Sequence, residues 1–220
     1  MMEQKKKVIK NPIHFAVELN QEQKEAKDTI LRNKITVLKG FAGSGKSMLA
    51  AQIALDLLFR KEVSRIILTR PTVTAGEEIG FMPGNIDSKL APYTAAIYDN
   101  MYRLYNRDKI DSLLHEGKIE VIPLAFMRGR NMTDCIVVVD EAQNVTDKQM
   151  ELMLGRLCNG SKMILCGDVA QIDLRDDRMS GFTFICENLK DIPGFSIVTL
   201  KTNHRDPIVE KIIEVYATRK

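Results

Sequence analysis

Short runs of β-forming residues, several of them apolar almost throughout, limit the fold of this 220-residue chain more than any other feature. A strand that is apolar along its whole length must be covered on both faces, as in a parallel sheet that lies between two layers of helices. The chain has six such runs, at residues 35–39, 65–69, 119–123, 135–139, 162–166 and 196–200. They predict a mostly parallel β-sheet with helices on both faces.

Helical patterns lie between these runs. Residues 46–59 have apolar positions four residues apart: Leu49, Ile53 and Leu57. Gln52 and Asp56 fall on the opposite side, which predicts one amphipathic helix. The tetrapeptide TDKQ at 146–149 is typical of a capping box that begins a second helix. That helix is expected to continue through Met150, Leu154 and Leu157.

A further helix is expected at about 94–106, with its inward positions at Ile97, Met101 and Leu104 or Tyr105. The stretch 71–93 before it is rich in glycine and proline, and we interpret it as an ordered surface loop with a function. Strand and helix otherwise alternate, which is typical of α/β proteins. The sequence predicts a single domain, 1–220, with a core of about 19–216 and a short basic N-terminal extension, 1–18.

The segment GFAGSGKS, residues 40–47, lies between the first predicted strand and the first long helix. It fits the G-x-x-x-x-G-K-[ST] pattern of a phosphate-binding loop in full. Gly43 and Gly45 lack Cβ atoms, so consecutive backbone N–H groups can converge on phosphate oxygens at the helix N-terminus. Lys46 would reach the β and γ phosphates, and Ser47 would ligate Mg²⁺. The expected nucleotide-contacting residues here are Gly40, Phe41, Ala42, Gly43, Ser44, Gly45, Lys46, Ser47 and Met48.

A pair of acids follows the fourth predicted strand, in CIVVVDEAQN. Asp140 comes directly after four apolar residues, so its carboxylate is expected at the carboxyl edge of the sheet, where ligands bind in open parallel sheets. Asp140 can hold Mg²⁺ through water, and Glu141 can orient and deprotonate an attacking water. Adjacent acids in these two roles indicate hydrolysis rather than transfer of a phosphoryl group to a small acceptor.

Composition restricts the class of protein less sharply. The formal net charge of +3 does not by itself indicate a polyanionic partner. The four cysteines, Cys135, Cys158, Cys166 and Cys186, have no CxxC spacing, so buried reduced thiols are favoured over disulfides or metal ligands. No apolar run is long enough to span a membrane or to form a signal peptide, and we expect a cytoplasmic protein without a membrane partner.

The ordered series LNQEQKEA, GFAGSGKS, VVVDEAQN and GDVAQID resembles the motifs of superfamily 1 helicase ATPase domains. The phrases IILTRPTVTAGEEIGFMPG and PLAFMRGR, together with DEAQN and GDVAQIDL, resemble the PhoH-like ATPase family more closely. The similarity extends over about residues 19–216. It implies a RecA-like P-loop ATPase core that uses ATP and Mg²⁺.

The resemblance also implies roles for three residues outside the phosphate-binding loop. Gln23 corresponds to a glutamine that reads adenine, because an amide can both donate and accept a hydrogen bond. Gln171, in GDVAQ, corresponds to a sensor of the γ-phosphate. Arg205, in LKTNHRDPIVEKI, corresponds to an arginine that neutralises charge in the transition state. His204, beside it, is expected to be a hydrogen-bonded packing residue without a catalytic role.

Helicases of this superfamily use two RecA-like lobes, whereas this chain has room for one. We therefore expect a homo-oligomer, such as a hexameric ring, in which a neighbouring subunit completes the ATP site. A single-stranded RNA or DNA partner is a weaker inference, carried by Arg70, Thr72, Arg128 and Arg130. These arginines could instead pair with acids or with nucleotide phosphate. The alternative function is an ATP-dependent assembly module that acts on a protein partner.

Overall fold

The computed structural model describes residues 13–71, 95, 97–127, 129–174 and 179–217. In these residues six strands form one parallel sheet in the order β3-β2-β4-β5-β1-β6. The strands are β1 (Ile35–Lys39), β2 (Arg65–Thr69), β3 (Ile119–Val121), β4 (Cys135–Val139), β5 (Lys162–Gly167) and β6 (Phe195–Thr199). All six predicted strands are confirmed, with differences of one or two residues at the ends of β3, β5 and β6.

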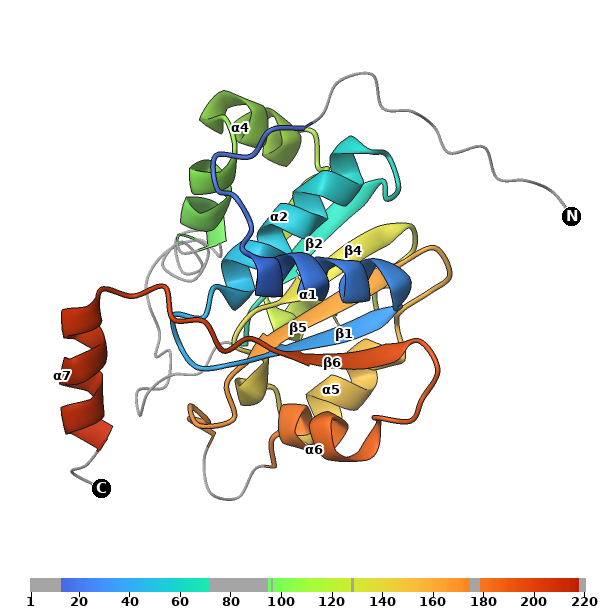
Figure 1. Ribbon diagram of the computed structural model, residues 1–220. Coiled ribbons are helices and arrows are strands. Elements are labelled where there is room, and N and C mark those ends of the chain that lie inside the picture. The colour runs from blue at the N-terminus through green and yellow to red at the C-terminus, as the bar shows by residue number, and fades with distance from the viewer. Residues whose placement is uncertain (1–12, 72–94, 96, 128, 175–178, 218–220) are drawn as a thin grey trace, which may run out of the picture.

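Helices cover both faces of the sheet, as the apolar strands predict (Figure 1). One hydrophobic core joins the sheet to α1 (Gln21–Arg32), α2 (Lys46–Phe59), a helix at 97–104 and α4 (Arg107–His115). The other core joins the opposite face to η1 (Leu124–Met127), η2 (Ala142–Asn144), α5 (Asp147–Leu154) and α6 (Gly181–Asn188). Both faces of the central strands are therefore buried, and β4 is buried at every position.

The helix α2 begins at Lys46 and ends at Phe59, as expected, but it is not amphipathic. Gln52 and Asp56 are both buried, which corrects the prediction that they face solvent. The reason is that α1 and the segment before it cover this side of α2. Gln52 Nε2 donates to Val17 O at 3.1 Å, and Asp56 pairs with Lys27 of α1 at 2.6 Å.

The predicted capping box is present at the start of α5, where the side chains of Thr146 and Gln149 each accept from the backbone N–H of the other. The helix ends at Leu154, one turn earlier than Leu157. In the helix at 97–104, Ile97, Met101 and Leu104 are buried, as its period predicts. The predicted loop falls almost wholly on residues 72–94, outside the described part of the chain.

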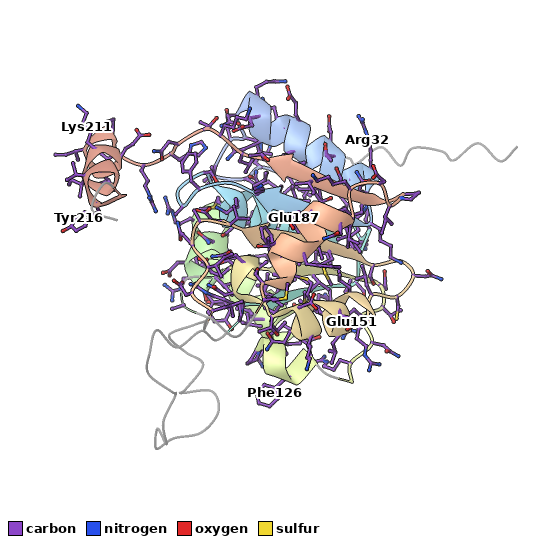
Figure 2. The ribbon with its side chains drawn as sticks, turned by 90° about the horizontal axis from the view of Figure 1, so that it is seen from below. Arg32, Phe126, Glu151, Glu187, Lys211 and Tyr216 are labelled. Atoms are coloured by element: carbon purple, nitrogen blue, oxygen red, sulfur yellow. The ribbon has the colours of Figure 1, made fainter. Side chains whose placement is uncertain are left out.

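The last helix, α7 (Pro207–Ala217), stands apart from the sheet in Figure 1. Figure 2 shows Lys211 and Tyr216 on this separated helix. The exposed large apolar side chains among the described residues of this helix are Ile208, Val209, Ile212, Val215 and Tyr216. A helix with such a surface is unusual for a part of a monomer that faces only water.

Cys135 and Cys166 are buried beside the strands, as expected, and all four cysteine thiols are free. Within the described ranges, no helix combines the length and the apolar character needed to cross a membrane.

Candidate nucleotide-binding site

A cavity of about 470 Å³ lies at the carboxyl edge of the sheet, a size typical of small-molecule sites. Its lining comes from the loop before α2 and from the residues after β4 and β5. The segment before α1, the helix at 97–104 and the segment before α7 complete the wall. The predicted site residues among its lining are Gln23, Ala42, Gly43, Gly45, Lys46, Ser47, Met48, Asp140, Glu141, Gln171 and Arg205.

The loop before α2 has the backbone of a phosphate cradle. Gly43 and Gly45 have φ angles of +96° and +82°, a conformation that residues with a Cβ rarely adopt. A Cβ on Gly45 would lie 2.9 Å from Gln23 Nε2, so a larger residue here would also displace the Gln23 amide. Lys46 Nζ donates to Gly40 O at 2.7 Å and to Phe41 O at 2.9 Å. The lysine therefore points into the cradle, where phosphate oxygens could replace these carbonyls.

Ser47 and Asp140 form a pair of oxygen ligands beside this cradle. Ser47 Oγ donates to Asp140 Oδ1 at 2.6 Å, although the two residues are 93 positions apart in the sequence. Burial raises the pKa of Asp140, and the hydrogen bond from Ser47 only partly offsets this effect. A buried carboxylate that gains little from its neighbours is stabilised by a bound cation. A hydroxyl and a carboxylate are ligands that Mg²⁺ prefers, so the pair fits that ion.

Glu141 is held in an unusual backbone conformation, with a φ angle of +51°. A left-handed backbone at a residue other than glycine costs energy and often marks a functional position. Gln143 Nε2 donates to Glu141 Oε2 at 2.6 Å, and Arg70 Nη2 lies 3.5 Å from Glu141 Oε1. The carboxylate is thus fixed at the cavity by two side chains.

Gln143 was not identified as a site residue from the sequence, yet it connects two of the predicted ones. Its side chain is fully buried and also donates to Gln171 O at 3.2 Å, while its Oε1 accepts from Asp168 N at 3.1 Å. Gln171 Nε2 in turn donates to Asp168 Oδ2 at 3.1 Å. The segments after β4 and β5 are therefore held together by side chains. The motif DEAQN contained this glutamine, but no sequence pattern shows which neighbours it joins.

Gln23 lies at another part of the cavity wall and forms a capping box with Asn20 at the start of α1. Gln23 Oε1 accepts from Asn20 N, so its Nε2 faces His204 Nε2 at 3.4 Å. Because an amide nitrogen only donates, His204 Nε2 is the acceptor. His204 N also donates to Gly43 O at 3.1 Å. His204 was expected to be a hydrogen-bonded packing residue; it does form hydrogen bonds, and it also lines the cavity and orients the predicted adenine reader.

Arg205 lies against the phosphate-binding loop. A Cβ atom added to Gly43 would lie only 2.7 Å from Arg205 Nε, so the arginine side chain packs directly on this glycine. The segment before it is anchored to α1, because Glu22 accepts from Lys201 N at 2.7 Å and from Thr202 N at 3.0 Å. Arg205 therefore approaches the loop before α2 of its own chain.

Two further cavity residues, Asn100 and Arg103, come from the helix at 97–104 and were not predicted. The sequence pattern of this helix revealed its buried positions only. Their place in the site follows from how the helix packs on α2 and the sheet, which is a long-range property.

A family model described as PhoH-like protein matches residues 17–217. The chain belongs to the PhoH-like protein family. PhoH-like proteins of Synechocystis sp. and Bacillus subtilis are 43% and 44% identical to it over 196 residues, or 88% of this chain. The matched segment is 60% and 61% of those two proteins, so this chain spans less than two thirds of the length of these relatives.

Solved structures support the same P-loop fold for this PhoH-like chain. The Pif1 helicase from Candida albicans has a TM-score of 0.50 and 17% sequence identity, over 90% of this chain and 43% of that one. The large terminase of a thermophilic bacteriophage has a TM-score of 0.54 and 8% identity, over 90% of this chain and 50% of that one. The RecA-like P-loop NTPase fold expected from the sequence is thereby confirmed.

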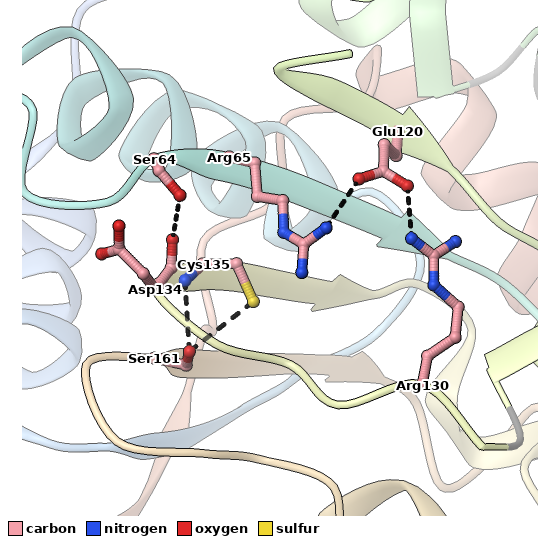
Figure 3. A network of polar contacts seen from close by, with 7 residues as sticks. All are labelled: Ser64, Arg65, Glu120, Arg130, Asp134, Cys135 and Ser161. Carbon is pink, nitrogen blue, oxygen red and sulfur yellow. Dashed lines mark hydrogen bonds and ion pairs between the residues drawn. The ribbon is translucent and has the colours of Figure 1, made fainter.

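The predicted nucleic-acid residues of this PhoH-like chain are only partly described. Thr72 and Arg128 lie outside the described residues. Arg70 pairs with Glu141, as given above, and so lies beside the candidate nucleotide-binding cavity. Arg130 Nη2 pairs with Glu120 Oε2 at 2.8 Å, and Arg65 Nη1 pairs with the other oxygen at 3.1 Å (Figure 3). Arg130 therefore holds the segment before β4 against β2 and β3.

Proposed function

We propose that this chain hydrolyses ATP to ADP and phosphate with Mg²⁺ at the cavity beside α2. The observation that carries the proposal is the convergence of Lys46, the Ser47–Asp140 pair and Glu141 at one edge of the sheet. A bound Mg²⁺ would neutralise charge on the β and γ phosphate oxygens. Side chains of the chain itself would bind the nucleotide and activate the attacking water.

Binding depends on the phosphate-binding loop. The N–H groups at the start of α2 and the Lys46 ammonium would bind the triphosphate, and Ser47 and Asp140 would hold the metal. Gln23 would select adenine by accepting from the N6 amino group through Oε1 and donating to N7 through Nε2, because guanine has an acceptor in place of the amino group. His204 supports this role by fixing the direction of the Gln23 amide.

Hydrolysis needs a group that orients water and takes its proton. Glu141 suits this role because Gln143 and Arg70 hold its carboxylate at the cavity. Gln171 is linked to Glu141 through Gln143, so the position of the γ-phosphate sensor and the position of the base are coupled. Arg205 would stabilise the charge that develops on the transferred phosphoryl group.

We propose that the enzyme works as a homo-oligomer in which α7 docks on a second copy of the chain. Ile208 and Ile212 are 65% and 50% exposed, although large apolar side chains favour burial. The helix begins two residues after Arg205, so docking would connect a subunit contact to the nucleotide site. Light scattering with ATP and Mg²⁺ tests this. A mass several times 24.9 kDa supports it, and a strict monomer in every nucleotide state contradicts it.

We further propose that single-stranded RNA or DNA stimulates the hydrolysis. Phe126 of η1 is 55% exposed and offers an aromatic surface on which a base could stack (Figure 2). Phosphate release should rise when single strands are added, and the binding of the strands should weaken steeply with salt. If neither response occurs, the alternative remains, which is an ATP-dependent module that acts on a protein.

The decisive test of hydrolysis is Glu141→Gln. The variant removes the base and leaves the phosphate contacts, so we expect ATP binding to persist while turnover falls about 10²–10⁴-fold. Phosphate release and nucleotide affinity should be measured together. Glu151→Gln, at an exposed position of α5, is the matched control and should behave as the wild type. Normal turnover in Glu141→Gln would show that Glu141 is not the group that takes the proton from water.

A further inference from the structure

A second, smaller cavity of about 20 Å³ lies directly behind the Ser47–Asp140 pair. It is lined by residues of α2, of the carboxyl ends of β2 and β4, and of the helix at 97–104. Its polar lining residues are Ser47, Thr69, Asn100 and Asp140, and the others are apolar. One water molecule needs about 10–15 Å³ of such space and two to four polar partners. The size and the lining of this cavity meet both conditions.

Thr69, the last residue of β2, is the clearest sign that this cavity binds something. Its side chain is fully buried, and its Oγ1 has no hydrogen-bond partner among the described residues. A buried hydroxyl without a hydrogen-bond partner destabilises the fold. Its own backbone carbonyl accepts from Asp140 N at 2.9 Å, so Thr69 is firmly positioned beside the acid. A small polar occupant would satisfy the hydroxyl.

Asn100 supplies the second polar wall. It lines this small cavity and the nucleotide cavity as well, and so stands between them. Its amide can accept a hydrogen bond from water through the oxygen and donate one through the nitrogen. No side chain elsewhere in the described ranges hydrogen-bonds to it. The amide is therefore available to a ligand of the small cavity.

We propose that this cavity holds one ordered water that hydrogen-bonds to Thr69 Oγ1, to the Asn100 amide and to the Asp140 carboxylate. Thr69 and Asn100 are then positioning residues, because the water fixes the direction of the carboxylate that binds the metal. The inference rests on the proposed function, in which Ser47 and Asp140 hold Mg²⁺. Partners that orient a metal ligand in this way typically change metal affinity about 10–100-fold when they are removed.

The test compares two threonines of the sheet. Thr69→Val keeps the shape of the side chain and deletes the hydroxyl. Thr36→Val makes the same change in β1, where Thr36 is also buried with an unpartnered Oγ1 but does not line this cavity. Binding of a fluorescent ATP analogue is titrated with Mg²⁺ and repeated in EDTA. We expect Thr69→Val to raise the Mg²⁺ midpoint about 10-fold, with unchanged affinity in EDTA.

Thr36→Val should leave the Mg²⁺ midpoint at the wild-type value. Asn100→Leu should raise the midpoint as Thr69→Val does, and the double variant should be little worse than either single variant, because both remove the same water. A Thr69→Val midpoint equal to that of Thr36→Val overturns the proposal.

A high-resolution crystal structure of the wild type separates this inference from the proposed function. Density for a water within hydrogen-bond distance of Thr69 Oγ1 and Asn100 supports the site even if nucleotide binding turns out not to depend on Mg²⁺. A cavity without such density overturns the site even if ATP hydrolysis is confirmed.

Discussion

A carboxylate lies at each end of α2, Asp56 within the helix and Asp140 opposite its first turn, and the partners of the two carboxylates differ. At the carboxyl end, Asp56 pairs with Lys27 Nζ at 2.6 Å and with Arg60 Nε at 2.7 Å. At the amino end, Asp140 accepts from the Ser47 hydroxyl at 2.6 Å, and no lysine or arginine within the described ranges forms an ion pair with it. Burial raises the pKa of Asp140, and the hydrogen bond from Ser47 offsets only part of this rise.

This difference separates a structural acid from the acid for which we propose a role in metal binding. Removing a charge from water is costly unless a partner compensates for it. The chain supplies that partner for Asp56 from α1 and from the end of α2 itself. For Asp140 the compensation is incomplete, and an external cation would complete it. We therefore expect variants at the two ends of α2 to affect different measurements.

The largest effect is expected at the amino end, from Lys46→Ala. The variant removes an ammonium group that would contact two phosphates, which should cost about 3 kcal/mol, or roughly 100-fold in ATP affinity. The melting temperature should change little, because Lys46 contacts only loop carbonyls. Calorimetry with ATP measures the first effect. Lys24→Ala, at an exposed position of α1, is the control and should bind normally. Unimpaired ATP binding in Lys46→Ala would contradict the role of the loop.

At the carboxyl end, Asp56→Ala should have the reverse profile. It leaves Lys27 and Arg60 without their partner, which should lower the free energy of unfolding by about 2 kcal/mol, or roughly 4–8 °C in melting temperature. Thermal unfolding followed by circular dichroism measures this. Asp28→Ala, an exposed acid of α1, serves as the control. A loss of ATP affinity at unchanged stability would mean that the two ends are not separate in function.

The smallest effect is expected at Glu22, which ties the segment with Arg205 to α1. Partial burial raises the pKa of Glu22, but the hydrogen bonds from Lys201 and Thr202 outweigh it, and the pKa lies below its usual value of 4.5. The ionised form therefore stabilises the fold above pH 4.5, and this contribution is lost as the pH falls through the lowered pKa. Glu22→Gln should remove this part of the pH dependence and cost less than about 1 kcal/mol.

Melting curves of Glu22→Gln and of the wild type between about pH 3 and 7 test the sign of that effect. The two curves should differ most at neutral pH and converge in acid. The exposed residue Glu25 gives the control variant, Glu25→Gln, which should follow the wild type throughout. A difference that grows as the pH falls would contradict the argument.

The sequence predicted what depends on local pattern. Apolar runs predicted the six strands that the structure describes, because most residues of a strand covered on both faces are apolar. The phosphate-binding loop and the Asp140–Glu141 pair were found because their spacing is fixed by backbone geometry over a few residues. The capping box of Thr146 and Gln149 was found for the same reason.

What the sequence did not predict depends on contacts between distant segments. The burial of Gln52 and Asp56 follows from the packing of α1 on α2. Asn100 lines the nucleotide cavity because a separate helix packs beside the loop. The ion pair of Arg70 with Glu141 and that of Arg130 with Glu120 join residues that no local pattern relates. Both arginines were candidates for contact with nucleic acid, with pairing to acids as the open alternative, and in the structure both pair with acids of the chain.

The central claim is that the amino end of α2 binds a triphosphate with its metal. A crystal structure with a nonhydrolysable ATP analogue and Mg²⁺ tests this most directly. The account predicts phosphate density around Lys46 and a metal next to Ser47 and Asp140. The adenine ring should lie beside Gln23. Density at another surface, or a cavity without ligand at saturating concentration, would contradict it.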